Sequence, residues 1–235
     1  MINIRERIHI IIKRREIYIV SAVLLGFAII CFIVPGFLDD TKSQSFLVNF
    51  NRQLMHFLIQ YPLILLFSIP VFAILQNDMV FVRHGAYDKI FQTEVLVALV
   101  LALLYAAIKT MIECIFLFLS GGLMYIMATL VGFILLFLTA FMIMLLYLGL
   151  QSFLRKSIFS IMILTILLGL DTMSAVVYFP LLPDTLYLMA LPLSTAAAYA
   201  MGGQVNLLLL FSISLLKIVL ALVFFRFAIR RGKYA

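Results

Sequence analysis

Charged residues are scarce in this sequence. Only 11% of its 235 residues are Asp, Glu, Lys or Arg, whereas 66% are hydrophobic and the mean hydropathy is +1.24. A soluble domain is about 25% charged and about 45–50% apolar, and a compact globule of this length has too little interior to bury so much apolar surface. The composition therefore argues against a soluble enzyme and favours a chain that is solvated by lipid.

Cysteines and catalytic motifs are also nearly missing. The two cysteines, Cys31 and Cys114, lie in apolar runs without metal-ligand spacing, so we expect small core side chains and no metal site. The sequence contains no H-E-x-x-H, G-x-S-x-G or phosphate-binding G-x-x-x-x-G-K-[ST] motif. An intramembrane enzyme is thus disfavoured, no cofactor is expected, and any ATP used for transport must be bound by a separate chain.

Apolar runs separated by polar, Pro- or Gly-containing stretches predict an all-α polytopic membrane protein. A spanning helix needs roughly 20 apolar residues, and the runs end at breaker residues such as Pro35-Gly36. Six spans are expected within one transmembrane domain that covers residues 1–235. Their predicted ranges are 17–34, 61–76, 94–119, 123–150, 158–179 and 205–227.

The positive charge, +7 overall, is distributed unevenly between the predicted loops. The N-terminus, the 77–93 and 151–157 loops and the C-terminal end hold 13 of the 17 Lys and Arg residues, whereas the opposite loops hold only Lys42 and Arg52. Because basic residues favour the cytoplasmic side of a membrane, both termini are predicted to be cytoplasmic. The basic character therefore indicates membrane topology and not a nucleic-acid partner.

Three segments outside the spans carry further signals. Residues 1–16 are basic with isoleucines on one helical face, which predicts an interfacial amphipathic helix, although a frayed basic terminus is the alternative. Residues 180–204 are apolar but interrupted by prolines, which favours a re-entrant hairpin at the outer face over a seventh span. Residues 77–93 mix charges with aromatic side chains, so a short helix there has two roles open to it: lying on lipid or docking into a partner.

Four charged residues fall inside predicted spans, namely Lys109, Glu113, Asp171 and Lys217. The first two are four residues apart and share a helical face, and the last two have similar predicted depths and could pair. Intramembrane charges usually face a bundle interior or a water-filled cavity. Two roles therefore stay open: neutralising pairs that set the packing, or groups that face a translocation path or a subunit interface.

These features together resemble the permease subunits of type-2 ABC exporters, more narrowly the small bacterial permeases of peptide, bacteriocin and lantibiotic export and immunity. The amphipathic N-terminus, the six spans with a basic C-terminus and the broken 180–204 segment carry the resemblance. So does the 82–91 segment, which is similar to the R-x-G-S-x-x-K-W-W signature of such permeases. Arg83, Gly85 and Lys89 match that signature, whereas Ala86 replaces its Ser and Ile90-Phe91 replace its aromatic pair.

The resemblance implies a coupling helix at residues 80–92 that docks on a separate ABC ATPase subunit, which binds the ATP. It places Arg83, Gly85, Tyr87, Lys89 and Phe91 at the docking surface. It also implies a second permease copy or a related permease, with the first and fifth spans facing each other. The 180–204 hairpin, with Pro183 and Pro192, would form an outer gate in the plasma membrane of a bacterium.

Two other functional classes are weighed against the exporter. A six-helix substrate-capture component of an uptake transporter would need a polar pocket at the outer face, and the apolar 180–204 segment offers little of one. The remaining alternative is an integral membrane protein of another class. The substrate is not indicated by the residues themselves.

Overall fold

The computed structural model describes residues 15–33, 56–79, 87–119, 126–154, 156–178 and 207–231. Nearly all of these residues are helical, and none of them forms a strand. The predicted all-α class is confirmed for this part of the chain. The described elements are α2 (Arg15–Ile33), the π-helix η1 (His56–Gln60), α5 (Tyr61–Met79), α6 (Tyr87–Leu119), α7 (Ile126–Leu154), α8 (Ser157–Tyr178) and α11 (Leu207–Arg231).

Three of the described helices are long and apolar enough to cross a membrane. The qualifying stretches are Ile90–Leu119, Thr129–Leu154 and Leu208–Arg231. The other helices contain shorter apolar stretches, which are Ile17–Cys31, Leu58–Ile69 and Ser157–Met173. Each qualifying stretch exceeds the roughly 20 residues needed to cross about 30 Å of hydrocarbon.

The outer surface of the described helices is itself apolar. Leu208, Met127 and Ile158 expose 78%, 75% and 73% of their surface, and many other leucines and isoleucines are similarly exposed. Contiguous apolar surface of this kind is costly in water and is favourable where lipid is the solvent. The structure is therefore compatible with a membrane protein, in agreement with the composition.

Serine and threonine hydroxyls within the helices bond back to the chain. Thr172 Oγ1 donates to the carbonyl of Leu168 at 3.1 Å, and Ser214 Oγ donates to the carbonyl of Leu210 at 2.6 Å. Ser160, Thr165 and Ser212 form the same bond to the carbonyl four residues earlier. Because hydrocarbon offers no hydrogen-bond partners, this bonding lets small polar side chains lie at membrane depth.

Two helix boundaries differ from the predicted ones in an informative way. α6 begins at Tyr87 and not at 94, so the described part of the predicted 80–92 coupling helix is the start of the long helix itself. The reason is that no Gly or Pro interrupts residues 87–119, and Asp88 in the first turn interacts favourably with the helix dipole. α7 continues to Leu154, so the predicted 151–157 loop is nearly absent, again because no helix breaker is present.

The remaining boundaries agree with the predicted ones to within four residues. Parts of several predictions lie outside the described residues. These are most of the 1–16 interfacial helix, residues 80–86 with Arg83 and Gly85, and the 180–204 hairpin with Pro183 and Pro192.

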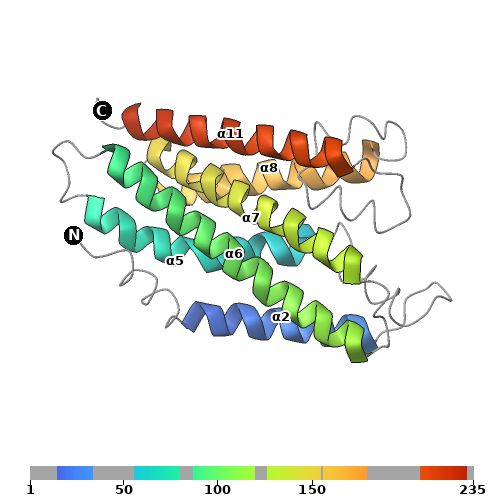
Figure 1. Cartoon of the computed structure of the whole chain (residues 1–235). Helices are drawn as coiled ribbons and strands as arrows, with labels where there is room; N and C mark the ends of the chain where they lie inside the picture. Colours follow the sequence, from blue (N-terminus) through green and yellow to red (C-terminus); the bar gives the residue numbers. More distant parts are fainter. Residues whose placement is uncertain are drawn as a thin grey trace.

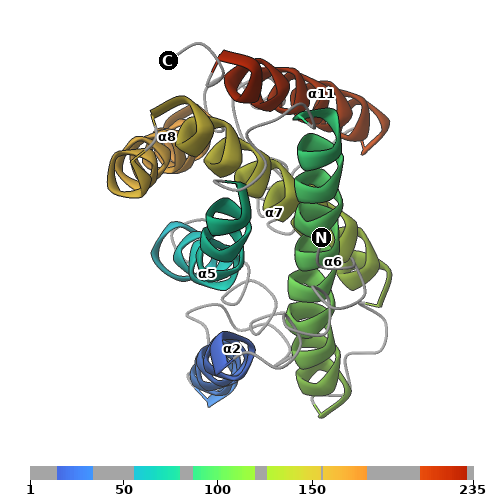
Figure 2. The same cartoon turned by 90° about the vertical axis from the view of Figure 1, so that its left-hand side faces the viewer.

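The described helices lie side by side in one bundle, with α7 in the middle (Figure 1). α7 packs most extensively against α11 and α6 and also contacts α8 and α5, whereas α2 contacts α5 and α6 at the opposite edge of the bundle from α11 (Figure 2). The apolar window of α7 is 61% buried, compared with 28% for that of α11. The core is therefore organised around α7.

A close crossing joins α7 to α11. A Cβ atom at Gly149 would lie 2.6 Å from ring carbons of Phe224 and 3.5 Å from the Cα of Phe225. A Cβ atom at Gly132, on the same helix, would have no such neighbour within 4 Å. The glycine at position 149 therefore allows the two backbones to approach closely, as small residues do at membrane helix interfaces.

Candidate functional site: a buried polar cluster and a basic end

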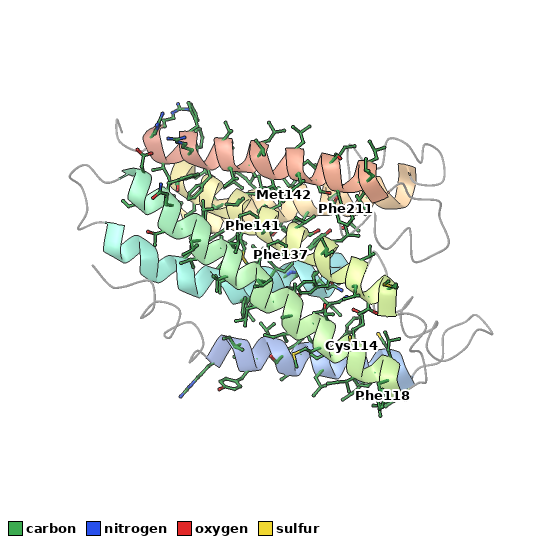
Figure 3. The ribbon with its side chains drawn as sticks, in the orientation of Figure 1. Cys114, Phe118, Phe137, Phe141, Met142 and Phe211 are labelled. Carbon is green, nitrogen blue, oxygen red and sulfur yellow. The ribbon has the colours of Figure 1, made fainter. Side chains whose placement is uncertain are left out.

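One face of α6 carries a row of buried polar side chains at four-residue intervals. Tyr105, Lys109 and Glu113 expose 0%, 2% and 3% of their surface. Lys109 Nζ donates to Glu113 Oε2 at 3.1 Å, which forms an ion pair inside the bundle. Cys114 was predicted to be a core side chain, but it is exposed, because it lies on the opposite side of α6 from this row; Phe118 is exposed as well. Both residues lie at the end of α6 that is close to α2 (Figure 3). The charges therefore occupy the protected face of the helix, and their opposite signs cancel.

Tyr105 connects this row to the start of α5. Its hydroxyl donates to the backbone carbonyl of Gln60 at 3.3 Å, where η1 passes into α5. Pro62 follows closely, and its ring and missing N–H disfavour a regular α-helical turn before it. The wider π-helical turn accommodates the proline, and the Tyr105 hydroxyl supplies the Gln60 carbonyl with a donor from a neighbouring helix. Such π-helical turns occur frequently at functional sites.

Tyr61 connects the same junction to α8. Its hydroxyl donates to Asp171 Oδ2 at 2.8 Å, and the two residues expose only 1% and 7% of their surface. Asp171 also interacts electrostatically with Lys217 of α11. The pairing of Asp171 with Lys217 stays a prediction, and the hydrogen bond from Tyr61 to Asp171 was not predicted. The only available signal for this contact would have been that the second and fifth predicted spans are antiparallel. The start of the second span then lies at the same end of the bundle as the end of the fifth.

Replacing Tyr61 with phenylalanine should lower the free energy of unfolding by about 1–3 kcal/mol. The substitution keeps the ring but removes a hydrogen bond donated to a buried carboxylate, and a hydrogen bond of this kind contributes about that much. Thermal unfolding in detergent would measure the change. Tyr18→Phe is the matched control, because Tyr18 is 68% exposed on α2. Equal melting temperatures for the two variants would contradict this role of Tyr61.

An apolar groove lies beside the Tyr61–Asp171 bond. Its volume is about 400 Å³, which falls within the usual range of small-molecule sites. One wall comes from η1 and α5, and the other comes from α8. The lining residues are Leu58, Tyr61, Pro62, Leu65, Leu66, Ile69, Ile161, Thr165 and Leu168.

The other notable feature is a basic end of the bundle, where α6 begins and α11 ends. Arg226 forms an ion pair with Asp88 at 3.3 Å and lies over the ring of Phe91, which in turn packs against Phe225 with 5.4 Å between ring centroids. Phe91, predicted at a docking surface, is thus half-buried against the chain's own α11. Tyr87 and Lys89 lie in the same first turns of α6.

Further cations at this end lie over aromatic rings. Arg231 lies over Phe153 at the end of α7, with 4.8 Å between the guanidinium carbon and the ring centroid. Lys156 lies over Phe159 at the start of α8, with its ammonium 5.6 Å from the centroid. Cation–π contacts of this kind hold long basic side chains at a membrane boundary. We name the set Arg15, Lys89, Lys156, Arg226, Arg230 and Arg231 the basic end.

Comparison with known proteins identifies no relative: no family model matches the chain, and no curated protein or solved structure matches it. Among the described residues, no three metal-ligating side chains come together. The function is therefore argued from the groove, the basic end and the buried polar cluster, by which we mean Tyr61, Tyr105, Lys109, Glu113 and Asp171.

Proposed function

We propose that this chain is the permease subunit of an ATP-driven ABC exporter in the plasma membrane of a bacterium. The observation that supports this most is the continuity of α6. The helix starts in the segment that resembles the permease signature and runs without interruption to Lys109 and Glu113 in the buried polar cluster. A movement of the docking segment at the basic end would therefore be transmitted along α6 to the buried polar cluster.

The proposed orientation places the basic end in the cytoplasm. Apart from Lys109 and Lys217, the Lys and Arg residues of the described helices all belong to helix ends on this side of the bundle (Figure 1). The positive-inside rule then assigns this side to the cytoplasm. With six spans, both termini lie on the cytoplasmic side. The 180–204 segment, which contains Pro183 and Pro192, then lies on the outer side of the membrane, where we propose that it forms a gate.

The proposed partner at the basic end is a separate ABC ATPase subunit, which binds and hydrolyses the ATP. Its docking surface is residues 80–92, supported on the inner side by the Phe91–Phe225 contact and the Arg226–Asp88 ion pair. A second permease copy, or a related permease, completes the transporter. The proposed cargo is a peptide or another amphipathic substrate, moved for export or for immunity.

Charge reversal in the proposed docking segment tests the assignment. Arg83→Glu and Lys89→Glu should each reduce co-purification of the ATPase from native membranes by about ten-fold or more, because like-charge juxtaposition at an interface costs several kcal/mol. Membrane insertion and expression should be unchanged. Lys156→Glu is the matched control at the same end of the bundle, since its exposed ammonium lies outside the docking segment.

Two results would overturn the proposal. One is an ATPase that co-purifies with both variants as it does with the wild type while transport is normal. The other is a wild-type chain that captures no ATPase from its native membrane at all. If only the Lys156→Glu variant fails to co-purify with the ATPase, the docking surface lies near the end of α7 and not at residues 80–92.

A further inference from the structure

The last described helix, α11, has a buried face and an exposed face along its length. Its buried residues recur every three or four positions, at Leu210, Ser214, Ile218, Ala221 and Phe225. The opposite face is apolar, and only 28% of the apolar window of the helix is buried. We name as the α11 stripe the residues Leu216, Val219, Leu220, Val223 and Phe227, each of which exposes more than half of its surface. No other described helix covers this stripe, since α11 lies along the edge of the bundle (Figure 1).

Two arginines continue the α11 stripe at the end of the helix. Arg230 follows Val223 by seven residues and Phe227 by three. Both arginines are exposed, and Arg231 follows Phe227 by four residues, so both lie on the side of the helix that carries the stripe. Eleven residues separate Val219 from Arg230, which is about 17 Å along the helix axis and close to half of the roughly 30 Å hydrocarbon core of a membrane. The stripe and the arginines therefore match the depth of one leaflet, with the positive charge at the level of the headgroups.

The two arginines are accessible to an anion. Their neighbour Arg226 forms an ion pair with Asp88 at 3.3 Å, but in the described part of the chain neither Arg230 nor Arg231 forms one. The guanidinium carbon of Arg231 lies 4.8 Å from the centroid of the Phe153 ring. A guanidinium over an aromatic ring can still donate its N–H groups, which lie in its own plane, to the oxygens of a phosphate. The end of α11 therefore presents uncompensated positive charge beside an apolar surface.

Charge complementarity decides which molecule suits this surface. A second copy of the chain that met it with its own α11 stripe would bring like charges together, which is costly at an interface. A phospholipid instead combines an acyl chain, which suits the stripe, with a phosphate, which suits the arginines. A zwitterionic lipid also carries a compensating positive group, whereas a lipid with a net negative charge is attracted by basic residues near the membrane surface. The surface is therefore complementary to an anionic phospholipid.

We infer that the α11 stripe, Arg230 and Arg231 together bind an anionic phospholipid, with an acyl chain along the stripe and the phosphate at the arginines. Apolar contact holds the chain without selecting among headgroups, so the selectivity comes from the arginines. The site does not include residues 80–92, and the binding needs neither ATP nor an ATPase subunit. A failed binding test would leave the docking proposal intact, and a failed docking test would leave the lipid site on a membrane protein of another class.

Photolabelling with two matched phospholipids tests the inference. Phosphatidylglycerol and phosphatidylcholine that carry the same diazirine-bearing acyl chain would each be added as a minor component to phosphatidylcholine nanodiscs that contain the whole protein. Mass spectrometry of peptides would locate the labelled residues. Phosphatidylglycerol should label residues 216–227 about ten-fold more than phosphatidylcholine does, because the two arginines attract its anionic headgroup.

Two variants separate the arginines from the general positive charge of the basic end. Arg230→Gln combined with Arg231→Gln should reduce labelling by phosphatidylglycerol to the level of phosphatidylcholine, whose own labelling should not change. Arg15→Gln is the matched control and should label as the wild type does, because Arg15 is exposed on α2, at the opposite edge of the bundle from α11 (Figure 2). Three results would overturn the inference: equal labelling by the two lipids in the wild type, an equal loss in Arg15→Gln, or a stripe that neither lipid labels because another copy of the chain covers it.

Discussion

Replacing Lys109 with leucine should lower the free energy of unfolding by about 3–5 kcal/mol, which is the usual cost of breaking a buried ion pair by removing one of its members. Lys109 and Glu113 are 3.1 Å apart, and their side chains expose only 2% and 4% of their surface. Both charges therefore lie on the buried face of α6. Glu113→Leu should therefore be about as damaging as Lys109→Leu.

The double variant distinguishes packing from charge. With both residues replaced by leucine, neither charge of this pair remains, and the stability should return to within about 1 kcal/mol of the wild type or exceed it. Met111→Leu, at a 65% exposed position of the same helix, serves as the control. If the double variant were as unstable as each single variant, the pair would not act as a neutralising unit.

The protein supplies its own reporter for these measurements. It contains no tryptophan, but Cys31 is buried and Cys114 is exposed. In a Cys114→Ser background, a thiol-reactive dye would report only the exposure of Cys31 as α2 separates from the bundle during heating. All stability variants can be compared in this background.

Gly149→Leu should be the most damaging of the packing substitutions, at about 3 kcal/mol or more. A Cβ atom at this position would lie 2.6 Å from the Phe224 ring and 3.5 Å from the Cα of Phe225. Overpacking of a filled interior costs about 1–3 kcal/mol, and here the displaced elements are α7, at the centre of the bundle, and α11. The dye assay on Cys31 would show the lower melting temperature.

Gly132→Leu is the control for Gly149→Leu, since it adds the same side chain to the same helix where no neighbour lies within 4 Å. It should change the melting temperature little. Pairing Gly149→Ala with Phe224→Ala should restore part of the stability that Gly149→Ala loses, because the obstructing ring is removed. Equal effects at positions 132 and 149 would show that leucine disturbs α7 by some route other than the crossing with α11.

Sequence periodicity and hydropathy predicted the helices well and their contacts poorly. The apolar runs located α7 and α8 because composition alone determines where a chain is stable as a helix in lipid. The start of α6 was misplaced because Asp88 and Lys89 were interpreted as the end of a separate helix, although a polar first turn is compatible with a continuing helix. Charge suggested that Lys109 pairs with Glu113 because the two residues are close in sequence.

The Tyr61–Asp171 bond was not predicted for a physical reason. The two residues are 110 positions apart, and their contact depends on how α5 and α8 are placed around α7. Tyrosine is also common at the ends of membrane helices, where it contacts the lipid interface, so its position at the start of a span gives no hint of a buried partner. The same argument applies to the groove, whose two walls come from distant segments.

The unbroken length of α6 gives the bundle a mechanical property. About 22 residues separate Tyr87 from Lys109, which is about 33 Å along a helix axis at 1.5 Å per residue. If the helix pivots near Tyr87, a tilt of about 5° displaces Lys109 by about 3 Å, comparable to the whole length of its bond to Glu113. A rigid rod of this kind converts a small rotation at the basic end into a movement of about the length of a hydrogen bond at Lys109.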